Sequence, residues 1–270
     1  MVENRFNVID AHCHVYPDKI AEKAARATDG FYDVHGFGDG TVSMLMSEGK
    51  KAGIDRFIVQ SVATTPKQVS SINRFIASEV EKSDGVLIGL GTLHPDSVDM
   101  EKDVEEIISL GLHGVKLHPD IQGFKIDDYR CLKIYELCEK ARLPILMHTG
   151  DSRYDNSNPN RLIPILEIYT DLIIIGAHFG GWSIWEEASK LLHGIPNLYV
   201  DCSSSFAWLP DDGIVKEIFA RYGSDRVLFG TDYPMWSPKV EIDRFLSLGF
   251  SDDDKRKILS ENAMKVFNIK

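Results

Sequence analysis

Two histidines one residue apart, His12 and His14, lie in the segment VIDAHCHVYP near the start of the chain. On an extended strand, alternate side chains point to the same side, so both imidazoles would project from one face. Neutral imidazoles are common metal ligands, and two of them side by side make half of a metal site. An isolated His-x-His is as often a pair of surface histidines, and the rest of the chain has to decide between the two interpretations.

Other polar residues of the same kind follow apolar runs further along the chain. Six of the nine histidines fall where such a run ends, which would be improbable if they were scattered over the surface. The polar residues at these ends, besides His12 and His14, are His94, Lys116, His118, His148, His178 and Asp232.

The apolar runs themselves indicate the architecture. Eight of them alternate with longer stretches that have apolar residues at spacings of three and four, the pattern of amphipathic helices. The runs are residues 6–14, 55–62, 85–93, 113–119, 143–150, 172–180, 197–205 and 226–234. Their continuously apolar centres suit parallel strands that are covered on both faces. Eight strand-then-helix units in 270 residues favour a single-domain α/β fold, a (β/α)8 TIM barrel spanning residues 1–270, over an open doubly wound sheet.

Two segments depart from the repeating unit. The first interval is long, and TDGFYDVHGFGDGT (residues 28–41) within it predicts an excursion after strand 1, a lid over the barrel mouth, rather than a phosphate-binding loop. The last segment, SDDDKRKILSENAMKVFNI, predicts a C-terminal helix capped by Ser251. Helices are also expected to begin at Asp127 or Asp128 and to end at Gly111 and Gly223.

Composition excludes several classes of function. A net charge of −11 argues against nucleic-acid binding, which needs a basic face. No apolar run approaches the roughly 18 residues of a membrane span, and the first residues lack a secretory signal, so a cytoplasmic protein is expected. The four cysteines are expected to be reduced, with Cys131 and Cys138 on one helix face and Cys13 pointing away from the two histidines.

Active sites of parallel barrels lie at the carboxyl ends of the strands. Closing the barrel would bring His12, His14, His148 and Asp232 around one point near its axis. Three imidazole nitrogens and one carboxylate oxygen suit Zn²⁺ or a neighbouring divalent ion. The sequence therefore predicts a metal site, most simply with one Zn²⁺ per chain.

The segments DAHCHVYP, GVKLHP, MHTG, GAHFGG and GTDYP, in this order, resemble the amidohydrolase superfamily. More narrowly, they resemble the branch that includes aminocarboxymuconate semialdehyde decarboxylase and various uncharacterised hydrolases. The resemblance implies that His12, His14, His148 and Asp232 are metal ligands. It also matches His178 to a sixth-strand histidine that in mononuclear members stays off the metal and binds or deprotonates its water.

Lys116 leaves an alternative open. In binuclear relatives a fourth-strand lysine is carboxylated and bridges two metals, whereas mononuclear members do not need it. Lys116 and His118 lie on the same face of their strand and either one could reach the site. We expect Lys116 to contact substrate or to pair with an acid such as Asp10, and His118 and Arg153 to contact substrate.

The leading functional hypothesis from the sequence is a metal-dependent hydrolase of a small amide, ester or lactone. In that mechanism, His178 or Asp232 takes the proton from metal-activated water. The first alternative is a non-oxidative decarboxylase, with Lys116, Arg153, Phe206, Trp208 and Trp236 as possible contacts for a carboxylated substrate. The second is a metal-binding protein without turnover, which would not need a base. We expect a small-molecule substrate, neither nucleic acid nor membrane as a partner, and pairing into a homodimer.

Overall fold

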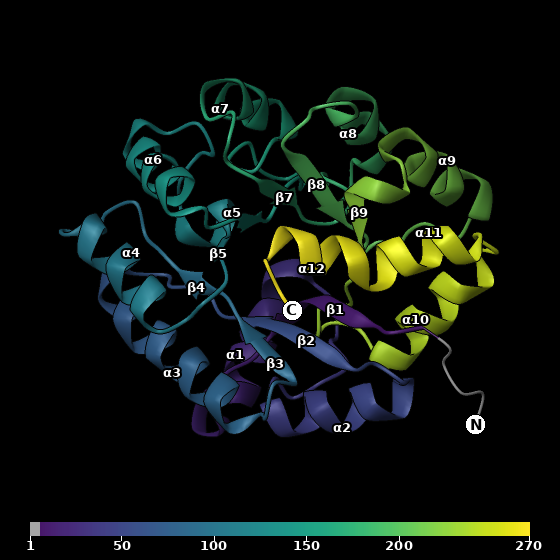
Figure 1. Cartoon of the computed structure of the whole chain (residues 1–270), viewed down its shortest axis with the longest axis horizontal. Coiled ribbons are helices and arrows are strands. Elements are labelled where there is room, and N and C mark those ends of the chain that lie inside the picture. Colours follow the sequence, from purple (N-terminus) through teal and green to yellow (C-terminus); the bar gives the residue numbers. More distant parts are fainter. Residues whose placement is uncertain (1–5) are drawn as a thin grey trace.

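The computed structural model describes residues 6–270 and consists of a ring of parallel strands surrounded by helices (Figure 1). The strands are β1 (Ile9–His14), β2 (Arg56–Gln60), β3 (Leu87–Gly89), β4 (Gly91–Thr92), β5 (Val115–Leu117), β6 (Ile145–Met147), β7 (Ile174–Gly176), β8 (Leu198–Asp201) and β9 (Val227–Leu228). All pairings between neighbouring strands are parallel. Each of the eight predicted runs contains strand structure, which confirms the repeating unit.

The third predicted strand is divided between two sheets. β3 pairs with β2, and after Leu90 the chain turns to pair with β5 as β4. The backbone N–H of Leu90 donates to Val59 O at 2.9 Å, and the N–H of Gly91 donates to Gly114 O at the same distance. One run of residues therefore joins the sheet β1-β2-β3 to the sheet β4-β5-β6-β7-β8-β9.

The two sheets also meet on the other side of the ring. Ala11 N–H donates to Phe229 O at 2.9 Å, Asp232 N–H donates to His12 O at 2.8 Å, and Cys13 forms a parallel bridge with Tyr233. These bonds join β1 to the chain after β9 and close the barrel. The TIM-barrel prediction is thus confirmed over the open-sheet alternative.

Helices surround the barrel between successive strands (Figure 1). They are α2 (Val42–Ala52), α3 (Val69–Lys82), α4 (Met100–Ser109), α5 (Pro119–Gln122), α6 (Leu132–Ala141), α7 (Leu162–Ile168), α8 (Trp185–Leu192), α9 (Asp212–Tyr222) and α10 (Pro238–Ser247). The predicted helix boundaries agree with the structure at Asp128, Gly111 and Gly223. Asp128 accepts a hydrogen bond from Arg130 N at the start of a 3₁₀ turn, and Gly111 and Gly223 adopt φ of 68° and 82° where helices end.

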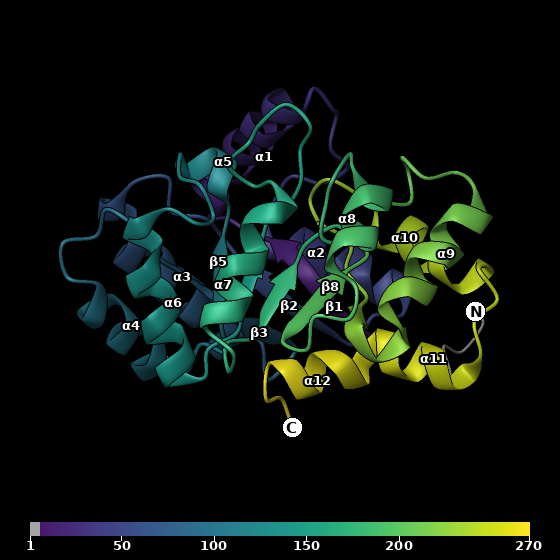
Figure 2. The ribbon, with the colours of Figure 1, turned by 90° about the horizontal axis from the view of Figure 1, so that it is seen from above.

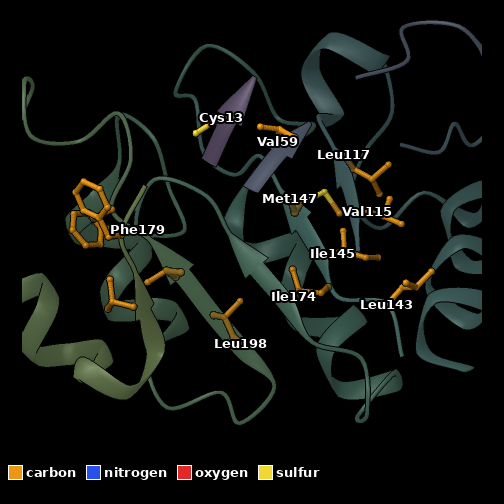
Figure 3. Packing of buried hydrophobic residues seen from close by; sticks show 14 of the residues in the cluster. Cys13, Val59, Val115, Leu117, Leu143, Ile145, Met147, Ile174, Phe179 and Leu198 are labelled. Carbon is orange, nitrogen blue, oxygen red and sulfur yellow. The ribbon is translucent and has the colours of Figure 1, made fainter. Parts of the chain in front are cut away.

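The apolar side chains form two clusters because residues of a strand alternate between its faces. Ile58, Leu146 and Ile175 pack inside the barrel. Val115, Leu117, Ile145 and Met147 belong to the larger cluster outside it, and Figure 3 shows them spreading from neighbouring strands toward the helices. Cys131 and Cys138 are buried and free in this outer cluster, as expected.

Helices cover the two ends of the barrel differently (Figure 2). The C-terminal segment forms α11 (Asp252–Arg256), a π-helical turn and α12 (Asn262–Val266), with Ser251 Oγ accepting from Asp254 N at its start. Ala263 and Phe267 pack against the barrel-interior cluster and cover the amino ends of the strands. At the opposite end lies α1 (Asp18–Tyr32), which includes only residues 28–32 of the predicted excursion, whereas residues 33–41 are a loop as expected. Among residues 6–270, none of the helices combines the length and apolarity that crossing a bilayer requires.

Candidate metal centre and active site

A bulge in β1 sets the direction of the first two candidate ligands. Ala11 packs inside the barrel and Cys13 packs outside it, and the register against β2 shifts between Asp10 and Cys13. Bulges re-aim side chains in this way and are common next to active sites. His12 and His14 flank Cys13 and both face the mouth of the barrel, while Cys13 points away from them as predicted.

Three of the four predicted ligands converge on one point. His12 Nε2 lies 3.2 Å from His14 Nε2 and 3.3 Å from Asp232 Oδ1, and His14 Nε2 lies 3.6 Å from the same oxygen. Asp232 follows the last strand in a left-handed conformation with φ of 60°. A β-region or αR backbone would aim its carboxylate elsewhere, so the strained conformation belongs to the construction of this site.

Asp201, at the end of β8, fixes the first histidine. Its Oδ2 accepts from His12 Nδ1 at 2.9 Å, and its Oδ1 accepts from Ser203 N, Ser203 Oγ and His178 N at 3.0, 2.5 and 3.1 Å. Burial alone would raise the pKa of Asp201, but the nearby His12 and these hydrogen bonds hold it well below its usual range. A carboxylate that accepts from Nδ1 leaves the lone pair of the imidazole on Nε2.

This donor set fits a divalent cation. His12 Nε2, His14 Nε2 and Asp232 Oδ1 form one of the groups of ligand atoms that lie within 4.8 Å of one another. The tautomer that Asp201 imposes turns the lone pair of His12 toward this group. Two imidazole nitrogens and one carboxylate oxygen bind Zn²⁺ and Mn²⁺, and three protein ligands leave coordination positions for water or substrate.

His148, the fourth predicted ligand, stands beside this group rather than in it. Its Nδ1 lies 3.2 Å from His178 Nε2, and its ring stacks on that of His118 at 3.9 Å between centroids. Its role as a metal ligand stays a prediction. Among the described residues, His148 also forms a second group with His118 and Asp120, whose Oδ2 lies 3.8 Å from His148 Nε2.

His178 is arranged as a base. Its Nδ1 lies 2.9 Å from the carbonyl oxygen of Ser203, which can only accept, so the proton of the neutral ring resides on Nδ1 and the lone pair on Nε2. Burial lowers its pKa to about 4, although Asp232 and Asp201 oppose that effect. His178 is therefore neutral at pH 7 and has a nitrogen ready to take a proton.

Lys116 points into the site from β5. Its fully buried Nζ lies 3.1 Å from His12 Nε2, and burial lowers its pKa to about 8 despite the charges of Asp232 and Asp201. Asp10, the acid considered as its partner, instead accepts from Thr231 N and Oγ1 at 2.9 and 2.6 Å. Lys116 therefore belongs to the candidate metal centre rather than to a separate ion pair.

A cavity of about 630 Å³ opens above these residues. At its inner end lie the candidate ligands with Lys116 and His118, and its outer walls come from α1 and α3. Apolar residues of these outer walls are Ile20, Ala24, Ala27, Phe31, Ile72 and Phe75. A second, smaller cavity of about 20 Å³ adjoins it and is lined in part by Trp182, Trp208 and Trp236. The arrangement suits a small apolar molecule whose polar groups are gathered at one end.

Arg153 is placed differently from the expectation that it contacts substrate. It is not among the residues that line either cavity. Its Nε and Nη2 donate to Asp151 at 2.9 and 2.7 Å, and its Nη1 donates to the carbonyl oxygen of Phe31 at 2.8 Å. The guanidinium is therefore occupied by a buried carboxylate and by the end of α1.

Sequence reasoning missed several residues of the site. Asp201 ends β8 and Ser204 follows it. Ser204 Oγ donates to Asp232 Oδ2 at 2.5 Å and accepts from Trp236 Nε1 at 2.7 Å. Gln60 ends β2 with both amide atoms buried and without a partner among the described residues, but it lines neither cavity. Their position at or just after strand ends was the available signal. By that criterion only the histidines, Lys116 and Asp232 had been chosen. Tyr32 could not be found in this way, because it lies in the segment between β1 and β2 and not at a strand end.

Comparisons with known proteins find relatives over most of the chain. The family model described as amidohydrolase matches residues 9–269. The chain is 22% identical over 238 residues to 2-amino-3-carboxymuconate-6-semialdehyde decarboxylase of Dictyostelium discoideum. That match covers 73% of this chain and 66% of the relative, so the chain spans slightly less than two thirds of the relative's length.

Solved structures support the barrel fold. An uncharacterised TIM-barrel protein from Bordetella bronchiseptica, Bb4693, superimposes with a TM-score of 0.79 at 21% identity, covering 98% of this chain and 99% of the other. A dihydroxybenzoic acid decarboxylase from Polaromonas sp. JS666, with bound manganese and the inhibitor 2-nitroresorcinol, gives a TM-score of 0.74 at 16% identity, with coverage of 98% and 97%.

Proposed function

The chain belongs to the amidohydrolase family, and from this premise we propose that it is a metal-dependent, non-oxidative decarboxylase of a small carboxylated substrate. The observation that carries the proposal is the group formed by His12, His14 and Asp232 at the inner end of a largely apolar cavity. Decarboxylation is favoured over the hydrolysis that the sequence put first because the curated relative and most of the similar structures with a named activity are decarboxylases. A putative 2-pyrone-4,6-dicarboxylic acid hydrolase from Pseudomonas putida has the same fold, which keeps hydrolysis as the second candidate.

His12, His14 and Asp232 would hold the cation, with His148 as the further ligand that the resemblance implies. The bound ion would polarise the oxygens of the substrate and lower the pKa of its water. Zn²⁺ is the ion expected from the sequence, and manganese is the ion in the Polaromonas enzyme. The donor set accepts both, so the identity of the metal is part of the proposal.

The residues of the chain have to place a carboxylate and move one proton. His178 Nε2, which carries a lone pair, would take a proton from solvent and pass it to the carbon that bears the carboxylate. The bond between that carbon and the carboxylate carbon then breaks, its electron pair returns to the substrate skeleton, and carbon dioxide leaves. His178 is neutral again at the end of the cycle. Lys116 and His118, at the same end of the cavity, orient the anionic end of the substrate.

Hydrolysis remains the second candidate because His178 is a neutral base beside the candidate ligands. In that reaction His178 would take a proton from water as the oxygen attacks a carbonyl carbon, and would return it to the leaving group. We also propose a cytoplasmic location and a homodimer.

The deciding experiment measures products. The protein, loaded with Mn²⁺ or Zn²⁺, is incubated with dihydroxybenzoic acids, other carboxylated aromatics, and a matched panel of lactones, esters and amides. We expect release of carbon dioxide that is lost in the metal-free protein and in His14→Ala. Hydrolysis of a lactone or ester by the same preparation, without release of carbon dioxide from any carboxylate, would reject the decarboxylase in favour of the second candidate.

A further inference from the structure

Tyr32 brings a hydroxyl to the site from outside the barrel. It is the last residue of α1 and lines both the 630 Å³ cavity and its smaller neighbour. Tyr32 Oη lies 2.7 Å from His118 Nε2 and 3.4 Å from His148 Nε2. Helix α1 therefore adds a hydroxyl group to the polar cluster that is formed by side chains at the strand ends.

The hydrogen bonds of His118 determine which way the proton of this hydroxyl points. His118 Nδ1 accepts from Ile121 N at 3.3 Å, so the neutral ring carries its proton on Nε2 and donates it to Tyr32 Oη. The Tyr32 proton must then point away from His118. The acceptor it faces, His148 Nε2, makes only a long bond at 3.4 Å. An anionic oxygen would accept from it at about 2.5–2.7 Å, in a bond roughly twice as strong as a neutral one.

Arg153 fixes the position of Tyr32. Its Nη1 donates to Phe31 O, one of the last carbonyl groups of α1, where a cation is also favoured by the helix dipole. Its guanidinium carbon lies 5.2 Å from the ring centre of Phe31 and 5.5 Å from that of Tyr32. The paired carboxylate of Asp151 is buried, which holds the guanidinium itself in place.

Few apolar side chains anchor the rest of α1. Only Ala21 and Ala25 of its fifteen residues are buried, and Pro17 at its start provides no side-chain cap. Two buried methyl groups contribute little apolar area, so the docking of this helix depends largely on polar contacts. Arg26 and Asp29 bind the backbone of residues 36–38, and Arg153 binds the carbonyl oxygen of Phe31. The contact of Arg153 is the one adjacent to Tyr32 and sets where its hydroxyl lies.

We infer that Tyr32, held by His118, is an anion-binding contact of the active site, and that Arg153 is the positioning residue that keeps it there. The ligand chemistry it fits is a carboxylate or phenolate oxygen of the substrate. The inference rests on the proposed function, since it names the substrate group that this part of the site takes. It also gives α1 a role beyond covering the barrel mouth.

Tyr32→Phe tests the contact because it removes one hydroxyl and keeps the ring. The probes are 2-nitroresorcinol and dihydroxybenzoate, titrated by calorimetry into the manganese-loaded protein, with neutral resorcinol as the comparison. We expect the Kd of both anions to rise about 10- to 100-fold in the variant, the effect of losing a hydrogen bond to a charged group, while resorcinol changes by less than about twofold. Equal anion affinities in the two proteins, or no binding of either anion to the wild type, would overturn the inference.

Arg130 provides a matched control for Arg153. It pairs with Asp128 as Arg153 pairs with Asp151, through Nη2 at 2.7 Å in each case, but its Nη1 donates to Asp96 rather than to α1. Arg153→Ala should weaken anion binding as Tyr32→Phe does, with no further loss in the double variant, because both changes remove one contact. Arg130→Ala should leave the Kd unchanged and cost less thermal stability than Arg153→Ala, because Asp128 is partly exposed whereas Asp151 is buried. An unchanged Kd in Arg153→Ala, or an equal loss in Arg130→Ala, would reject the positioning role.

Release of carbon dioxide separates this inference from the proposed function. If the wild type binds the anions but releases no carbon dioxide from any carboxylate, the decarboxylase proposal fails and the anion-binding contact stands. If the wild type turns over a carboxylate and Tyr32→Phe does so with the same KM, the contact fails and the decarboxylase stands.

Discussion

Replacing Asp201 with asparagine should switch the tautomer of His12. The carboxylate accepts from His12 Nδ1 through Oδ2, and Oδ1 accepts from Ser203 N, Ser203 Oγ and His178 N. Two of the donors on Oδ1 are backbone N–H groups that cannot turn away. An asparagine would therefore keep its oxygen on that side and direct its NH₂ toward His12 Nδ1.

The expected loss of metal affinity follows from the NH₂ group that this asparagine would place opposite His12 Nδ1. Facing an NH₂ group, His12 is stable only with its lone pair on Nδ1 and its proton on Nε2, the atom that faces His14 and Asp232. Binding a cation at Nε2 would force the proton back to Nδ1 and leave two donors opposed. An unsatisfied buried donor costs about 1–3 kcal/mol, so the affinity for the metal should fall about 5- to 150-fold.

The assay is a competition titration of Zn²⁺ or Mn²⁺ against a chelator, combined with ¹⁵N NMR of the metal-free protein to locate the proton of His12. Ser203→Ala is the control, because it removes a donor to the Asp201 carboxylate and a hydroxyl 3.1 Å from His12 Nδ1, but leaves Asp201 Oδ2 facing His12 Nδ1. We expect this control to retain the Nδ1–H tautomer and most of the affinity. Wild-type affinity in Asp201→Asn, or a proton still on Nδ1, would refute the reasoning.

Three further predictions concern the base, the metal content and the buried acids. His178→Asn should keep the metal, measured by elemental analysis, but lose about 10²- to 10⁴-fold in kcat, and an equal loss of metal would make His178 a ligand. Elemental analysis of wild type should give about one tightly held ion per chain, and two ions with added mass on Lys116 would indicate a carboxylated bridge. Burial, with the charges of Asp10 and Asp232, raises the pKa of Glu241 from 4.5 to about 8. Its contribution to stability is therefore present below pH 4.5 and lost as the pH rises through 8. In urea titrations at pH 5 and 9, Glu241→Gln should remove about 3–5 kcal/mol of the wild-type difference, and parallel curves would contradict the assignment.

The repeating elements of this chain could be predicted because they depend on local pattern. Alternating apolar runs and amphipathic stretches marked each strand, and the glycines at 111 and 223 marked helix ends. Closure needed the structure, because it consists of hydrogen bonds between β1 and the chain after β9, more than 200 residues away. The division of the third strand and the helix α1, which precedes and enters the predicted excursion, were not foreseen, since each depends on what the segment packs against.

For the candidate site, too, the sequence pattern predicted which residues come together but not how they are protonated. The position of His12, His14 and Asp232 at strand ends was enough to bring them together once the barrel closed. The side chains that decide their protonation come from elsewhere. Asp201 ends a strand from which no candidate was selected, and its effect on His12 depends on a contact across 189 positions. The position of polar residues at strand ends identifies the candidates for a site. The tautomers of its histidines are set by hydrogen-bond partners that lie elsewhere in the sequence.

Two short segments show why local pattern could not assign Arg153. Asp128-x-Arg130 and Asp151-x-Arg153 have the same sequence spacing, and in both the arginine side chain binds the preceding carboxylate through Nε and Nη2. The remaining Nη1 contacts Asp96 in the first case and the carbonyl oxygen of Phe31, 122 positions away, in the second. Their difference in role thus lies in a single long-range bond, which the structure alone reveals. If the two alanine variants behave differently in anion binding, that bond, and not the motif, accounts for it.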